Sequence, residues 1–235
     1  MTECTKDVWL SDVIKRPAYK LNIESFSNTQ DLHHIKKQLE RESFVYFRSP
    51  VRSIQLNRFF QSQGFYLVET NIYLEKKNIT SRIPIKCDVR FAQSGDQGEI
   101  SEIAKNSFIF SRFHLDPHFD SRTANIIKSS WVNNYFAKQR GDAMIVAYDH
   151  NEITGFLLLL FCENKLIIDL IAVKDTFRNK GIAQTMIDFA QSHFDHFLRI
   201  GVGTQICNIP SLRLYEKSGF TISQAQYVFH YHHKI

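Results

Sequence analysis

Hydrophobic and polar positions alternate with two periods in the second half of the chain. A period of two predicts strands at residues 87–92, 143–148, 153–162, 167–173 and 197–204. Near-helical spacing predicts helices at residues 96–106, 122–137 and directly after Gly181. Residues 221–231 are predicted to form two further strands. Strands that alternate with helices in this way indicate an α/β fold, with a sheet flanked by helices.

The amino-terminal third is separated from this pattern by a polar stretch, residues 75–86, that contains Pro84. We therefore predict two domains, residues 1–80 and 87–235. Within the first, residues 60–65 repeat the spacing of residues 215–220, in which a helix, a Gly-Phe pair and a strand follow one another. Chance similarity of a common helix-to-strand turn is the alternative explanation.

The segment after the predicted strand 167–173 has the composition of an anion site. Arg178, Lys180 and Gly181 directly precede a helix, whose first amide groups and dipole attract negative charge. Gly181 allows close approach of the backbone, and the two basic side chains would neutralise a phosphate. This segment is predicted to bind a pyrophosphate group.

Two motifs resemble the GNAT superfamily of N-acetyltransferases. The first is Arg-Asn-Lys-Gly-Ile-Ala at residues 178–183, and the second extends from Asn208 through Tyr215 to Phe220. The resemblance implies a mixed central sheet, splayed between two strands, and acetyl-CoA as cosubstrate without a metal. Together with the repeat at residues 60–65, it indicates a smaller, degenerate GNAT-like domain at residues 1–80 that packs against the sheet or completes it. This domain is expected to do no chemistry, because Phe60 stands where the second copy has Tyr215 and no glycine loop with flanking basic residues precedes it. The implied coenzyme contacts are Ile171, Ala172, Val173, Arg178, Asn179, Lys180, Gly181, Ile182, Ala183, Asn208, Leu214 and Tyr215.

The resemblance also assigns catalytic roles. Tyr215 matches the tyrosine that protonates the departing thiolate, and the backbone near Val173 would bond the thioester carbonyl. Asn208 would contact the pantetheine arm or cap the following helix. Asp169 interrupts an apolar strand four residues before Val173, so we expect both on one face. Asp169 would serve in acid–base catalysis or contact the substrate, or it would make a structural hydrogen bond to the neighbouring strand. A water chain is the alternative base. No cysteine lies in a nucleophile motif, which favours direct transfer in a ternary complex.

The loop at residues 111–120 and the helix after it are similar to the acceptor wall of the TDP-fucosamine acetyltransferases. That resemblance implies a nucleotide-linked amino sugar of bacterial surface-polysaccharide synthesis as acceptor. Arg112 would pair with a phosphate, and Phe113 and Phe119 would stack on a base or sugar. The predicted substrate contacts are Arg112, Phe113, His114, His118 and Trp131, with Asp116 as a further group that could orient the amine.

Composition narrows the alternatives. The net charge of +5 is scattered rather than concentrated in a run, so a small anionic ligand or an ordinary solvated basic surface explains it as well as DNA does. No sequence motif supports nucleic-acid binding, so none is predicted. The four cysteines are far apart and no long apolar segment occurs, which predicts a cytoplasmic protein without membrane insertion. Residues 114–118 alternate His, Asp and His but lack a fourth ligand, and His230, His232 and His233 are expected to be exposed, so no metal site is predicted.

Two alternative functions remain. One is acetylation of another amine, such as a peptide, polyamine or antibiotic, and the other is an acyl-CoA-binding module without turnover. The sequence also leaves a homodimer open.

Overall fold

The computed structural model describes residues 2–23, 42–79 and 87–233. Its strands are β1 (Thr2–Lys6), β2 (Ala18–Ile23), β3 (Phe44–Pro50), β4 (Tyr66–Lys77), β5 (Asp88–Phe91), β6 (Ala143–Asp149), β7 (Glu152–Cys162), β8 (Lys165–Val173), β9 (Arg199–Gln205) and β10 (Thr221–His232). Its helices are α1 (Val8–Ile14), α3 (Ile54–Ser62), α4 (Gln97–Ser107), α5 (Arg112–Leu115), α6 (Ser121–Phe136), α7 (Ile182–His193) and α8 (Ile209–Lys217), with 3-10 turns η1 (Ser94–Asp96) and η2 (Asp175–Phe177). The α/β class and every strand and helix predicted between residues 87 and 204 are confirmed.

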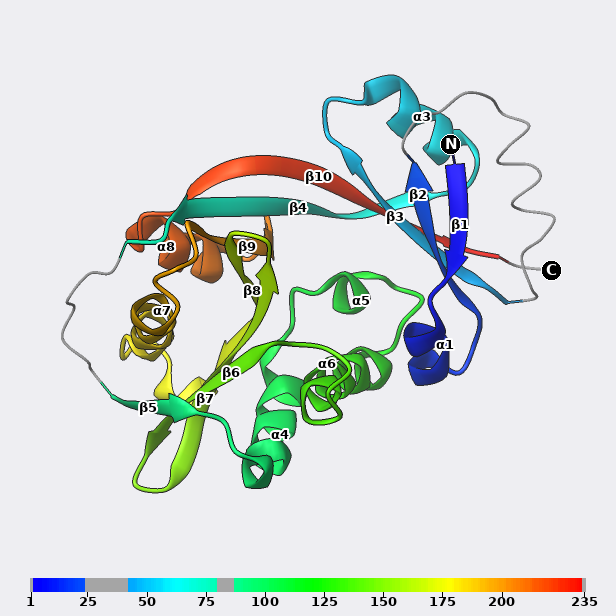
Figure 1. Ribbon diagram of the computed structural model, residues 1–235. Helices are drawn as coiled ribbons and strands as arrows, with labels where there is room; N and C mark the ends of the chain where they lie inside the picture. Colours follow the sequence, from blue (N-terminus) through cyan, green and yellow to red (C-terminus); the bar gives the residue numbers. More distant parts are fainter. Residues whose placement is uncertain (1, 24–41, 80–86, 234–235) are drawn as a thin grey trace.

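The described strands form one sheet in the order β1-β2-β3-β10-β4-β9-β8-β7-β6-β5. Strand β4 lies between β9 and β10, so a strand from the amino-terminal part is built into the sheet of the carboxyl-terminal part. Conversely, strand β10 from the carboxyl-terminal part pairs with β3 of the amino-terminal part. Figure 1 shows β4 and β10 side by side, bridging the two halves. The predicted boundary at 75–86 thus begins inside β4, and its part from residue 80 to 86 lies outside the described residues.

The prediction of two strands at residues 221–231 is wrong, because β10 runs unbroken from Thr221 to His232. Its pairing with β4 shifts register between Ile222 and Gln224 and again between Val228 and Phe229. Such irregularities bend and twist a strand locally without ending it. One long strand can therefore serve both halves of the sheet.

Helices cover both faces of the sheet in the carboxyl-terminal half (Figure 1). Helices α7 and α8 pack on one face in a core that includes Met186, Ile200 and Leu212. Helices α4 and α6 pack on the other face, where Ile103 and Val132 are buried. The sheet is thus held between two apolar layers, and polar groups between them need a partner or a ligand.

Strands β8 and β9 separate partway along their length. They are paired in parallel from Lys165 to Ile168 of β8, and no pairing is found beyond Ile168. The predicted splay is confirmed, and the edge of β8 from Asp169 to Val173 carries backbone groups that none of the described strands covers on that side.

A β-bulge falls at the point of separation. Leu158 and Leu159 of β7 oppose Leu170 and Ile168, which leaves Asp169 as the additional residue. Val173 packs against the core under α7, whereas Asp169 bonds Trp131 on α6. The expectation that Asp169 and Val173 share one face is wrong, because the bulge reverses the alternation between them.

Candidate active site

A cleft of about 1530 Å³ opens where β8 and β9 separate. Its lining joins the exposed edge of β8, the start of α7, helix α8 and the segment at residues 107–111 before α5. A volume above the usual range for one small ligand is suited to two molecules held together. The predicted coenzyme residues 171–173, 178–183, Asn208, Leu214 and Tyr215 all lie on this lining.

The loop before α7 has the form of an anion cradle. Asn179 and Gly181 have positive φ angles, 63° and 82°, and no side chain caps the helix that starts at Ile182. The amide groups of Ile182 and Ala183, in the first turn, therefore face the cleft without a carbonyl partner among the described residues. These free donors and the positive helix end favour a phosphate there.

The basic side chains of this loop are arranged around it. Arg178 donates from Nε to the carbonyl of Val173 at 3.2 Å and pairs with Asp175 at 2.6 Å. Lys180 lies 4.6 Å above the ring of Phe177. Arg178 thus ties the cradle to the end of β8, which fixes the cradle relative to the open strand edge.

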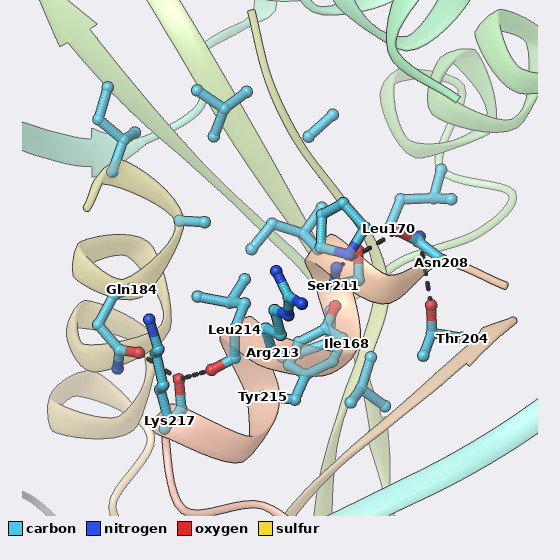
Figure 2. Close-up of a pocket in the computed structure, with 18 of the residues that line it drawn as sticks. Ile168, Leu170, Gln184, Thr204, Asn208, Ser211, Arg213, Leu214, Tyr215 and Lys217 are labelled. Carbon is cyan, nitrogen blue, oxygen red and sulfur yellow. Dashed lines mark hydrogen bonds between the residues drawn. The ribbon is translucent and has the colours of Figure 1, made fainter. Parts of the chain in front are cut away.

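Tyr215 lies on α8 at the other side of the opening. Figure 2 shows it together with Ile168 and Leu170 of β8 among the residues that line the pocket. Its side chain is 2% exposed, and its hydroxyl has no hydrogen-bond partner among the described residues. Burial raises the pKa of Tyr215 well above its usual range, so the phenol keeps its proton. A protonated hydroxyl without a partner in a cleft is able to donate to a ligand.

Asn208 begins α8, as the capping interpretation predicts. Its side-chain oxygen accepts from the amide of Ser211 at 3.3 Å, and its side-chain nitrogen lies 3.4 Å from the hydroxyl of Thr204 (Figure 2). Pro210 in the first turn has no amide to satisfy. The cap orients α8, and with it Tyr215, against the open edge of β8.

Asp169 is fully engaged by its neighbours. It accepts two hydrogen bonds from Arg140, at 2.8 and 2.7 Å, and one from the indole of Trp131 at 2.9 Å. Its side chain is 8% exposed. The bonds come from α6 and the loop after it, and not from the neighbouring strand that the structural alternative predicted. A carboxylate held in this bidentate pair is arranged to position α6 against β8, and both of its oxygens are already engaged by protein donors.

Apart from Ser111, the loop at 111–120 does not line the cleft as expected. Phe113 and Phe119 are 1% and 9% exposed and form a core with Phe44, so the expectation that they stack on a base or sugar is wrong. The guanidinium of Arg112 lies 3.7 Å from the ring centroid of Tyr46, and burial lowers its pKa. Apolar rings in this loop are buried because α5 packs against the amino-terminal half.

The remaining predicted acceptor residues lie beside the cleft rather than on its lining. His114 bonds Ser111 at 2.6 Å and Asn125 at 2.8 Å, while His118 lies 3.0 Å from the hydroxyl of Tyr66. The indole of Trp131 is directed to Asp169. On the acceptor side the lining includes residues 107–111, Lys128 and Asp169. Lys128 was not singled out from the sequence, where it is one of several lysines with no motif around it.

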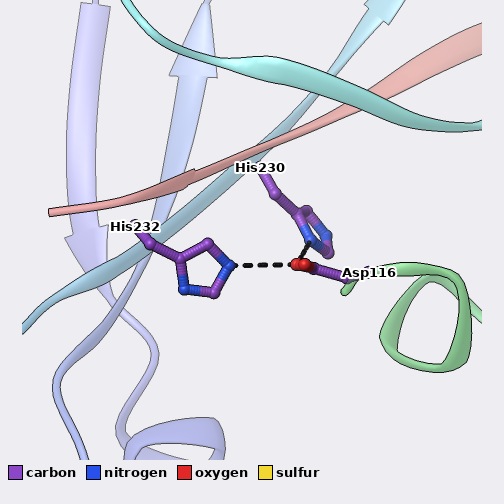
Figure 3. Close-up of side chains that lie close together, drawn as sticks. All are labelled: Asp116, His230 and His232. Atoms are coloured by element: carbon purple, nitrogen blue, oxygen red, sulfur yellow. Dashed lines mark hydrogen bonds and ion pairs between the residues drawn. The ribbon is translucent and has the colours of Figure 1, made fainter. Parts of the chain in front are cut away.

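A second polar cluster lies away from the cleft. His230 and His232, from β10, converge on Asp116 (Figure 3), and are held at 2.6 and 3.0 Å from one carboxylate oxygen. His230 is 0% exposed and the side chain of His232 is 7% exposed, so the expectation that these histidines are exposed is wrong. Both rings pack against Phe44. The other oxygen accepts from Tyr66 at 2.7 Å and from the amide of His118 at 2.9 Å.

These three residues are types that also bind divalent metals, and their ligand atoms lie within 4.8 Å of one another. The separations of 2.6 and 3.0 Å are hydrogen-bond lengths, shorter than the roughly 3.3 Å between two ligands of a tetrahedral zinc. Four hydrogen bonds lower the pKa of Asp116, against the effect of its burial, and burial lowers that of His230 to about 3. An ionised carboxylate between two neutral imidazoles accounts for the cluster.

The splayed sheet, the cradle at a helix start and the buried phenol across from it define an acetyltransferase fold of the GNAT type. The sequence model of the acetyltransferase (GNAT) family matches residues 105–220. Over 233 residues the chain is 28% identical to the spore coat polysaccharide biosynthesis protein SpsD of Bacillus subtilis, covering 95% of this chain and 80% of that protein. It is 33% identical to streptothricin acetyltransferase of Escherichia coli over 129 residues, 51% of this chain and 73% of that protein.

Solved structures show the same fold. A GCN5-related N-acetyltransferase from Sphaerobacter thermophilus superposes with a TM-score of 0.65 at 13% identity, covering 100% of this chain and 77% of that one. A tandem GNAT protein from the clavulanic acid biosynthesis pathway superposes with a TM-score of 0.62 at 8% sequence identity, covering 92% of this chain and 75% of that one. The chain belongs to the GNAT acetyltransferase family and is an N-acetyltransferase, as the sequence motifs predict. No helix in the described part of the chain is both long and apolar enough to cross a membrane.

Proposed function

We propose that the protein transfers an acetyl group from acetyl-CoA to the amino group of a nucleotide-linked deoxysugar, a TDP-linked 4-amino sugar in particular, in the synthesis of a surface polysaccharide. The observation that carries this proposal is the extent of the similarity to the spore coat polysaccharide protein, which includes the amino-terminal third as well as the GNAT motifs. The streptothricin acetyltransferase matches only half of the chain. A shared second half alone would indicate only the common chemistry.

In this proposal the coenzyme lies along the open edge of β8. Its pyrophosphate would be held by the amides at the start of α7 together with Arg178 and Lys180, and the pantetheine arm would enter between β8 and β9 beside Asn208. The backbone near Val173 would polarise the thioester carbonyl. Tyr215 would protonate the sulfur that leaves, since its hydroxyl is protonated and has no other partner.

The acceptor is proposed to lie between residues 107–111 and Lys128, on the α6 side of the opening. Trp131 would support this wall through its bond to Asp169. Arg112, His114 and His118 would shape the loop from behind, because they bond protein groups and lie outside the cleft lining. The amino-terminal half, residues 1–80, is proposed to be a degenerate GNAT-like domain that supplies β4 to the sheet.

A second candidate acceptor is an antibiotic amine, favoured by the 33% identity to streptothricin acetyltransferase across the catalytic half. An acyl-CoA-binding module without turnover is not favoured, because binding alone would not require an unpartnered phenol at the opening.

The test is a mass-spectrometric assay with acetyl-CoA and separate TDP- and UDP-linked amino sugars, streptothricin and a polyamine. We expect a gain of one acetyl group on a TDP-linked 4-amino sugar, and its loss in Tyr215→Phe. Tyr227→Phe, at a tyrosine of β10 that lies away from the cleft lining, is the matched control and should keep full activity. Transfer to streptothricin or the polyamine without transfer to any nucleotide sugar would overturn the sugar proposal.

A further inference from the structure

Lys128 is a buried cation with no anion in direct contact among the residues that the structure describes. It lies on α6, is 8% exposed, and its side chain reaches the lining of the cleft. No hydrogen bond or ion pair is made by its amino group with any residue that the structure describes. Its Nζ instead lies 4.8 Å from the ring centroid of Phe108 and 4.9 Å from that of Trp131. A buried, unpaired ammonium is costly, so such a lysine is normally either neutral or bound to a ligand.

The charges around Lys128 come from several elements. Asp169 on β8 and Glu69 on β4 favour its charged form, while Arg112 on α5 and Arg140 after α6 oppose it. His114 on α5 also lies within its field. Burial is the largest influence and lowers the pKa of Lys128 to about 8, from an ordinary value of 10.5. The amino group therefore exchanges its proton near neutral pH, where a general base works best.

We propose that Lys128 is the general base of the acetyl transfer and accepts a proton from the acceptor amine in the cleft. Its surroundings favour this role over that of an anchor for a phosphate or carboxylate of the acceptor. Two carboxylates lie close enough to influence it, and two aromatic rings flank it, an environment that attracts an ammonium group and repels an anion. Asp169, the base candidate from the sequence, is occupied by Arg140 and Trp131. This inference rests on the acetyl transfer to an amine and does not require that the amine belong to a sugar.

The step balances as follows. Neutral Nζ of Lys128 takes one proton from the acceptor ammonium and frees the lone pair on nitrogen. That pair forms the N–C bond to the thioester carbonyl carbon, and the C–S bond breaks with its electrons on sulfur. Tyr215 gives its proton to the sulfur and regains one from the newly bonded nitrogen, so the products are an N-acetyl amide, a thiol and protonated Lys128. Lys128 then releases its proton to solvent.

Glu69 would position this base electrostatically rather than touch the acceptor. It is 7% exposed, and one of its carboxylate oxygens has no partner. It bonds Gln205, a residue of the cleft lining, and burial raises its pKa against the influence of Arg112, Arg48 and Lys128. Since the Glu69 carboxylate raises the pKa of Lys128, removing its charge should lower that pKa.

Kinetics on three variants test the base. With any amine that the acceptor panel identifies, we expect kcat/KM to rise with pH through an apparent pKa near 8. Lys128→Met and Lys128→Arg should each lower kcat by about 10²- to 10⁴-fold, with little change in KM for acetyl-CoA. Glu69→Gln should keep most activity and move the acidic limb to lower pH. An anion anchor would behave differently, because Lys128→Arg would keep kcat and only Lys128→Met would raise KM for the acceptor. Wild-type kcat in Lys128→Arg would overturn the proposal.

A measurement independent of activity decides the case in which no acceptor is found or a variant fails to fold. Brief labelling of the native protein with an acetylating reagent at a series of pH values, read by mass spectrometry, follows the neutral fraction of each lysine. We expect the labelling of Lys128 to reach its midpoint near pH 8, and in Glu69→Gln at a lower pH. Lys105, an exposed lysine on α4, is the reference. A midpoint equal to that of Lys105 would overturn the base assignment. Failure of nucleotide sugars in the panel, with transfer to another amine, would overturn the proposed function alone.

Discussion

Two parts of the chain have the same local structure and different content. Helix α3 leads through Gly64 and Phe65 into β4, and helix α8 leads through Gly219 and Phe220 into β10. Both glycines have positive φ, 88° and 82°. In both units the phenylalanine amide bonds a carbonyl five residues earlier, at 3.0 and 2.9 Å. The repeat predicted from residues 60–65 and 215–220 is therefore present in the structure.

The difference between the units lies in one side chain. Phe60 is 0% exposed and packs among Phe47, Phe65 and Phe229, so it is fully buried in the core of the amino-terminal part. Tyr215, at the corresponding place, is nearly as buried but lies on the cleft. A single hydroxyl on an otherwise equivalent turn thus distinguishes a packing position from the one proposed to carry chemistry.

The largest expected effect comes from exchanging these two side chains. Tyr215→Phe should lower kcat by about 10²- to 10⁴-fold, because the thiolate loses its proton donor. The free energy of unfolding should hardly change, because the hydroxyl has no partner to lose. Steady-state kinetics and thermal unfolding of the same preparation measure both.

The reverse change, Phe60→Tyr, is its control. It should leave kcat unchanged and destabilise the protein by about 1–3 kcal/mol, because a hydroxyl enters a closed aromatic core. Loss of kcat in a folded Phe60→Tyr protein would contradict the assignment of this half to packing.

The next effect concerns stability in the amino-terminal unit. Phe60→Ala should lower the free energy of unfolding by about 3–5 kcal/mol, since the ring lies 4.4 Å from Phe47 and 5.2 Å from Phe65, centroid to centroid. Denaturant unfolding gives the value, and Phe60→Leu, which keeps most of the volume, should cost less. Equal losses for Ala and Leu would show that the core has rearranged.

Sequence patterns could predict the unit that contains Tyr215 and the separation of β8 from β9, because the motifs behind both predictions are short and continuous in the sequence. The apolar alternation of β8, the basic glycine loop and the Gly-Phe turns each lie within about a dozen residues. Asp116 and His230 are separated by 114 positions and meet only through the exchange of β4 and β10 between the halves. Lys128 was missed for the same reason, since its surroundings include Phe108, Asp169 and Glu69, which are distant from it in the sequence. The bulge at Asp169 reversed an alternation that appears regular in the sequence.

The two units also differ in the long strand that follows each of them, β4 or β10. Strand β10 brings His230 and His232 to Asp116, so acid should lower the free energy of unfolding. Burial holds the pKa of His230 near 3, below its ordinary 6.5, and the unfolded chain therefore binds a proton first as pH falls. We expect a loss of about 2 kcal/mol in unfolding free energy between pH 6.5 and pH 5. Below pH 3.8 Asp116, whose pKa is lowered, adds a further loss.

His230→Asn tests this window, because the amide keeps a donor toward Asp116 and does not titrate. Chemical denaturation at several pH values should show a smaller slope than in the wild type. His150→Asn, at a side chain that is 97% exposed, should keep the wild-type slope. An unchanged slope in His230→Asn would assign the acid sensitivity to other groups.

The smallest effect should be the same in both units. Gly64→Ala and Gly219→Ala each place a Cβ on a left-handed residue, at a cost of about 1 kcal/mol, and neither meets a close contact. Gly64 would have Tyr231 at 3.5 Å, an ordinary distance, and Gly219 nothing within 4 Å. Unfolding should therefore report equal losses, while KM and kcat should change only in Gly219→Ala, because that glycine lines the cleft and follows the helix that carries Tyr215. If both variants changed kcat alike, the two units would be coupled through β4 and β10, and the amino-terminal half would influence catalysis beyond its packing.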